Sequence, residues 1–158
     1  MELDSDLPVL KGNGHNLSSA RYLKDDRTAI GLDSKGSVII WSLRTGLKNT
    51  LRTEPANCLA VSPDFKEFAI GSSTKQGIFR YHLKSGELLS HSSASLLDKR
   101  LTNIAYSPDG QYIASTCSEV RQLDNKLVIL AGPRIGRPIH IPRAHSSSLN
   151  QFDIALDI

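Results

Sequence analysis

Cysteine is scarce in this sequence, and its two cysteines, Cys58 and Cys117, lie far apart in the chain. Neither belongs to a Cys-x-x-Cys pair, so the spacing typical of zinc sites and redox-active disulfides is missing. So few cysteines fit a reducing compartment. We therefore predict an intracellular protein, in the cytoplasm or the nucleus, that needs no metal and no other cofactor.

Long apolar runs are also missing. The longest ones, such as residues 127–132, fall far short of the roughly 20 residues that a membrane helix needs. The N-terminal segment carries acidic residues before its first apolar pair, which is unlike the basic and then apolar organisation of a signal peptide. We expect neither a membrane partner nor secretion.

An excess of charge of one sign is the third feature that the sequence lacks. It has 19 basic and 16 acidic residues, for a net charge of +3, which is too even a mixture to favour nucleic acid as a partner. The chain of 158 residues is 39% hydrophobic and 22% charged, as is usual for a soluble globular domain. We predict one domain with a solvated charged surface.

An internal repeat is the strongest positive signal. Residues 29–46 read AIGLDSKGSVIIWSLRTG, and residues 69–86 read AIGSSTKQGIFRYHLKSG. Aligned on these two segments, the chain shows a constant period of about 40 residues, which predicts a repeat architecture. Each copy reads as strand, turn, strand, turn, and no segment keeps a helical period, so we predict an all-β protein.

This period divides the chain into four units. Their approximate limits are residues 7–46, 47–86, 87–136 and an incomplete unit, 137–158. Residues 119–125 lengthen the third unit, and we expect them to form a long loop between two strands. The Ser-Pro-Asp sequences that begin at Ser62 and Ser107 are typical of turns.

The repeats resemble the WD-repeat family of β-propellers, in which one repeat encodes a four-stranded blade offset by a strand. Residues 106–115, YSPDGQYIAS, match the family pattern closely, residues 61–71 match it less closely, and Trp41 stands at the family's tryptophan. The resemblance covers nearly the whole chain. It implies an incomplete β-propeller of four-stranded antiparallel blades.

The family's buried hydrogen-bond chain of His, Ser or Thr, Asp and Trp is not retained. Its His position holds Asn13, Arg52 and Leu97, and its Asp position holds Lys35 and Lys75. We therefore expect the blades to be held together mainly by apolar burial between sheets.

WD-repeat proteins usually serve as docking platforms, so the resemblance implies a non-catalytic protein–protein interaction scaffold. By the family's geometry, the partner-binding face would carry Asn13, His15, Lys35, Arg52, Glu54, Lys75 and Gln76. Its basic members favour an acidic or phosphorylated peptide as the partner.

Two other classes of function stay open. A subunit of an RNA-containing assembly could use the basic region 125–152, which has Lys126, Arg134, Arg137 and Arg143 and no acidic residue. A propeller enzyme would need carboxylates or histidines that line a central channel, and the sequence shows no such cluster.

The resemblance also predicts an open ring. Residues 7–12 would be the outer strand of a blade for which residues 149–154 supply only the inner strand. Open sheet edges favour self-association or completion by another chain. We therefore expect the chain to be a fragment of a longer protein, a truncated product, or a piece completed by a partner.

Overall fold

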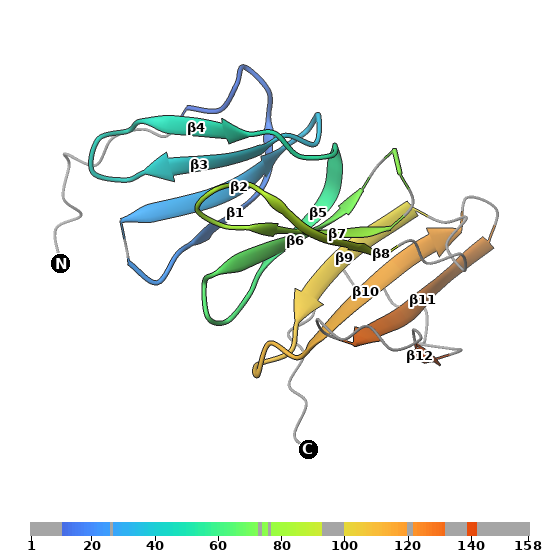
Figure 1. Ribbon diagram of the computed structural model, residues 1–158. Coiled ribbons are helices and arrows are strands. Elements are labelled where there is room, and N and C mark those ends of the chain that lie inside the picture. Colours follow the sequence, from blue (N-terminus) through green and yellow to red (C-terminus); the bar gives the residue numbers. More distant parts are fainter. Residues whose placement is uncertain are drawn as a thin grey trace, which may run out of the picture.

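A computed structural model of the chain describes residues 11–25, 27–72, 74–75, 77–92, 100–119, 122–131 and 139–141. The strands in these ranges pair in chain order into three four-stranded antiparallel sheets, as predicted (Figure 1). The first is β1 Leu17–Tyr22, β2 Thr28–Asp33, β3 Val38–Ser42 and β4 Lys48–Leu51. The second is β5 Ala56–Val61, β6 Glu67–Ser72, β7 Ile78–His82 and β8 Leu88–Ser92. The third is β9 Arg100–Tyr106, β10 Tyr112–Glu119, β11 Gln122–Ala131 and β12 Ile139–Ile141.

The three sheets, which we call blades 1, 2 and 3, follow one another face to face from the N-terminal to the C-terminal side (Figure 1). Because side chains alternate along a strand, each blade can present apolar residues to both neighbours. Between blades 1 and 2, Ile30 and Leu32 pack against Phe68 and Ile70. Removal of these surfaces from water supplies most of the stability of the interface.

Blade 2 joins blade 3 through a second apolar cluster. It contains Ala69 and Ile78 from blade 2 with Leu101, Ile104 and Ile113 from blade 3. The close approach is possible because Gly71 has no side chain: a Cβ atom there would lie 2.9 Å from the Cβ atom of Leu101. Small residues on blade 2 thus make room for larger ones on blade 3.

The constant repeat period aligns β3 with β7 correctly, but it places β2 one residue out of register with β6. In blade 1 Thr28 pairs with Ser42, whereas in blade 2 Glu67 pairs with His82. The turn between β6 and β7 is therefore one residue longer than the turn between β2 and β3. Since one residue reverses the face of a side chain, the structural equivalent of Ala29 is Phe68 and not Ala69.

The long loop expected at residues 119–125 is also wrong. Glu119 pairs with Gln122, and Cys117 pairs with Lys126, with an irregularity in the register between Cys117 and Glu119. The additional residues extend β10 and β11 into a longer hairpin, since backbone groups that pair with each other satisfy their hydrogen bonds.

Of the expected strand 7–12, residues 7–10 lie outside the described residues, and Lys11 and Gly12 are not in a strand. Residues 149–154 also lie outside them.

The outer side of blade 1 is partly covered by the segment before β1. Trp41, which is fully buried, donates its indole N–H to the carbonyl of Lys11 over 3.0 Å. Lys48 Nζ donates to the carbonyl of Gly12 over 2.7 Å. Strand β1 itself is exposed along its whole length.

Candidate functional site

Six of the expected partner-binding residues lie on connections at one end of the blades. Asn13 and His15 precede β1, Lys35 is in the β2–β3 turn, Arg52 and Glu54 are in the β4–β5 loop, and Lys75 is in the β6–β7 turn. We call this set the loop face. Gln76, the seventh expected member, lies outside the described residues. The other end of the blades carries the β1–β2, β3–β4, β5–β6, β7–β8 and β9–β10 turns.

Hydrogen bonds join the connections of the loop face to one another. The N–H of Ala56 donates to the carbonyl of Gly36 in the β2–β3 turn over 2.9 Å. On the other side, the N–H of Ser34 in the same turn donates to the carbonyl of Asn16 over 2.7 Å. Gly36 has a φ of 85°, and a Cβ atom at this position would lie 2.6 Å from the Ala56 nitrogen. The turn is thus held on both sides by neighbouring segments.

Asp33 organises the β2–β3 turn from a buried position. Its Oδ1 accepts the N–H groups of Lys35 over 2.9 Å and Ser37 over 2.8 Å. Burial opposes ionisation of this carboxyl group, but the N–H donors and the nearby His15 outweigh it and hold the pKa below its usual value. In blade 2, Ser72 Oγ accepts the N–H of Lys75 over 2.9 Å and fills the same role. Asp33 was not among the site residues expected from the sequence, although an Asp before a Ser-Lys-Gly turn is typical of such caps.

The charged side chains of the loop face differ in how available they are to a binding partner. Lys75 Nζ lies 2.7 Å from Glu54 Oε1, and this carboxylate raises the pKa of Lys75. Glu54 also donates its backbone N–H to the Tyr81 hydroxyl over 3.1 Å. Lys35 and Arg52 are exposed. Within the described part of the chain, neither of these two has an ion-pair partner.

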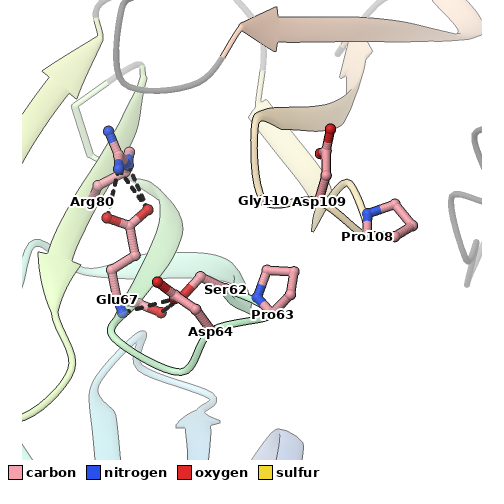
Figure 2. A pocket seen from close by; sticks show the side chains of 8 residues that line it. All are labelled: Ser62, Pro63, Asp64, Glu67, Arg80, Pro108, Asp109 and Gly110. Carbon is pink, nitrogen blue, oxygen red and sulfur yellow. Dashed lines mark hydrogen bonds and ion pairs between the residues drawn. The ribbon is translucent and has the colours of Figure 1, made fainter.

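A pocket of about 460 Å³ lies at the opposite end, between blades 2 and 3. Residues of two Ser-Pro-Asp turns line it, and Figure 2 shows Pro63 and Asp64 on one turn and Pro108 and Asp109 on the other. Each aspartate accepts the hydroxyl hydrogen of the serine in its own turn, Ser62 over 2.7 Å and Ser107 over 2.5 Å. The expectation that these sequences form turns is confirmed.

One wall of this pocket is an ion pair (Figure 2). Arg80 Nη2 donates to Glu67 Oε2 over 2.5 Å, and Arg80 Nε donates to Glu67 Oε1 over 3.0 Å. Tyr106 of blade 3 donates its hydroxyl hydrogen to the same Oε1 over 3.0 Å. Burial, together with the Glu67 charge, raises the pKa of Tyr106. A polar network of Arg80, Glu67 and Tyr106, which was not expected from the sequence, therefore adds to the apolar burial at this interface.

No protein-family model and no curated protein matches this chain. Several solved structures match it. The WD40 repeats of RRP9 align at 19% identity with a TM-score of 0.69, over 87% of this chain and 42% of that one. The β-propeller domain of Swd1 from Myceliophteria thermophila aligns at 16% identity with a TM-score of 0.66, again over 87% and 42%. This chain has the fold of a WD40-type β-propeller segment. It spans about 42% of the length of each of these structures.

The propeller fold alone does not decide between scaffold and enzyme. Hydrazine synthase from Kuenenia stuttgartiensis also matches, at 18% identity with a TM-score of 0.66, over 80% of this chain and 42% of that one. In the described part of this propeller, no group of three or more His, Cys, Asp or Glu side chains could hold a metal ion. Burial raises the pKa of the Cys58 thiol to about 12, so this thiol is not a reactive nucleophile.

The remaining expectations lie beyond what the structure tests. The side chains of the basic region 125–152 lie outside the described residues, so RNA binding through it stays a prediction. Among the residues that the structure describes, there is no helix with the length and apolarity needed to cross a bilayer.

Proposed function

We propose that the chain is a non-catalytic scaffold that binds other proteins through the loop face. The observation that supports it is the way in which connections of two blades join: the Gly36 carbonyl holds the β4–β5 loop through Ala56, and Glu54 on that loop holds Lys75 of the next turn. Connections whose backbones are fixed in this way lose little further backbone entropy when a partner binds.

The partner that suits this surface is an acidic or phosphorylated peptide. Lys35 lies in the β2–β3 turn and Arg52 in the β4–β5 loop, and both side chains are exposed. The guanidinium of Arg52 can bind a carboxylate or phosphate with two parallel hydrogen bonds, whereas Lys35 adds a point charge. Lys75 contributes less because Glu54 already neutralises it.

The test is a double charge reversal, Lys35→Glu with Arg52→Glu, followed by quantitative affinity purification from native lysate. The matched control is Arg44→Glu with Lys66→Glu, which makes the same charge change with exposed residues at the other end of the blades. Proteins that bind the loop face are expected to be lost by the first variant and kept by the second. The same set of bound proteins with both variants would refute the proposal.

We also propose that another propeller segment, from the same polypeptide or from another chain, covers the open edge of blade 1. This proposal is supported by the exposure of all of β1, in which Leu17 is 42% and Tyr22 is 74% exposed. An edge strand with exposed apolar side chains readily pairs with other strands. Sedimentation analysis of this chain should show self-association that Tyr22→Lys reduces; a monomer at all concentrations would contradict pairing between copies.

A further inference from the structure

A second pocket, of about 400 Å³, lies between blades 1 and 2 at the end opposite the loop face. We call it the inter-blade pocket. Its apolar lining comes from Leu23 and Leu83, which are buried, and from Ile40 and Phe65, which are partly buried against the core between the blades. Its volume lies in the range of ligand pockets, about 300–1,000 Å³. An apolar side chain of a ligand would therefore find both space and contact there.

Phe65 lines this pocket at a conformational cost. Its φ is 56°, and it is the one non-glycine residue with positive φ in the described part of the chain. The equivalent turn of blade 3 has Gly110, with a φ of 72°. Both turns close in the same way: the N–H of Phe65 donates to the Ser62 carbonyl over 3.0 Å, and that of Gly110 to the Ser107 carbonyl over 2.9 Å.

The ring is therefore what distinguishes the Phe65 turn from the Gly110 turn. A side chain in the left-handed region costs about 1–2 kcal/mol relative to glycine. A residue kept in such a conformation is a candidate for a functional role. Here the ring forms part of the apolar lining of the pocket.

The charges at the pocket are mainly positive. Lys24 and Lys84 line it and are exposed, and within the described residues neither has an ion-pair partner. Asp25 also lines it, but its oxygens accept the N–H groups of Arg27 and Thr28 and, over 2.6 Å, the hydroxyl of Thr28. The carboxylate is thus directed into its own turn, whereas the two ammonium groups are available to a ligand.

We propose that the inter-blade pocket binds a peptide segment of a partner protein in which an apolar side chain stands next to an acidic one. The apolar side chain packs on Phe65 and Leu83, and the carboxylate meets Lys24 and Lys84. Apolar burial supplies affinity, while charge complementarity selects acidic over basic sequences. This site lies away from the loop face and does not depend on the function proposed for it.

The test selects short random peptides, displayed on phage, for binding to the chain and measures the enriched peptides by fluorescence anisotropy. Sequences that combine Asp or Glu with Leu, Ile or Phe are expected. The double variant Lys24→Glu with Lys84→Glu should weaken binding by at least about tenfold, equal to about 1.4 kcal/mol. Lys66→Glu, in the same turn as Phe65 but outside the lining, should leave binding unchanged.

Phe65→Gly separates the two roles of the ring. Glycine adopts the required φ, so the turn is kept while the apolar contact is lost. We expect weaker peptide binding without loss of the folded state, as monitored by circular dichroism. Three results would each overturn the proposal: no enriched peptides, enriched peptides that bind the lysine double variant equally well, or dimerisation that depends on the two lysines, which would assign the pocket to a second copy of the chain.

Discussion

The carboxylate of Glu67 receives three hydrogen bonds from the guanidinium of Arg80, two at Oε1 and one at Oε2, at the interface between blades 2 and 3. Both side chains are about 85% shielded from solvent, with exposed fractions of 13% for Arg80 and 15% for Glu67. A charge that loses its partner in such a place has neither solvent nor a counter-ion to stabilise it. Mutations that remove only one member of this pair should therefore destabilise the interface between blades 2 and 3.

Glu67→Ala should lower the free energy of unfolding by about 2–4 kcal/mol, because it leaves the Arg80 guanidinium and the Tyr106 hydroxyl without their acceptor. The measurement is urea unfolding followed by tryptophan fluorescence. Replacement of both partners, Glu67→Leu with Arg80→Leu, should cost less than Glu67→Ala alone. If the double variant were the less stable of the two, the pair would be stabilising in its own right, and this reasoning would be wrong.

Stability should fall at alkaline pH because of Tyr106. Its folded-state pKa is raised, first by burial and then by the Glu67 charge, so the folded chain holds this proton more tightly than the unfolded chain does. The sign follows from linkage: stability is constant with respect to this group up to the unfolded pKa of about 10 and decreases at higher pH. Tyr106→Phe removes the titrating group, so its free energy of unfolding should decrease less steeply above pH 10. Equal slopes for the two proteins would contradict the prediction.

The sequence predicted the sheets well because their signals are local. Alternating apolar residues and the turns that begin at Ser62 and Ser107 define strands and their connections without reference to the rest of the chain. The loop face followed from the family geometry, and the structure places the described members of that set at one end of the blades. Whether these residues bind a partner stays a prediction.

The parts that the sequence did not predict depend on turn length and on distant contacts. The identical Ala-Ile-Gly segments that begin at Ala29 and Ala69 suggested one register, but the longer β6–β7 turn places Phe68 where Ala29 would be. The Glu67–Tyr106 contact joins strands of two blades, and no local pattern marks it. The positive φ of Phe65 is hidden because the residue is not glycine.

Asp33 provides a test of the β2–β3 turn. Asp33→Ala should lower the free energy of unfolding by about 1–3 kcal/mol, because the N–H groups of Lys35 and Ser37 lose their acceptor in a partly buried place. Asp33→Ser should recover much of the loss, since Ser72 caps the equivalent turn of blade 2 with its hydroxyl oxygen. Thermal unfolding by circular dichroism measures both. A serine variant no more stable than the alanine variant would show that the two turns are capped differently.

Gly31 and Trp41 provide the last prediction, which concerns the outer side of blade 1. A Cβ atom on Gly31 would lie 2.8 Å from Cζ3 of the indole and 2.7 Å from the Ser19 carbonyl oxygen. Gly31→Ala must therefore displace either the ring or strand β1, and overpacking of this kind costs about 1–3 kcal/mol. Displacement of the ring would also break its N–H contact with the Lys11 carbonyl and shift the emission maximum of this single tryptophan to longer wavelength.

Gly14→Ala is the matched control, because its Cβ atom meets no atom within 4 Å and its cost comes only from a φ of 81°. The control should lose about 1 kcal/mol with no change in emission. If Gly31→Ala left both stability and emission unchanged, the indole would not pack on this glycine as the structure has it.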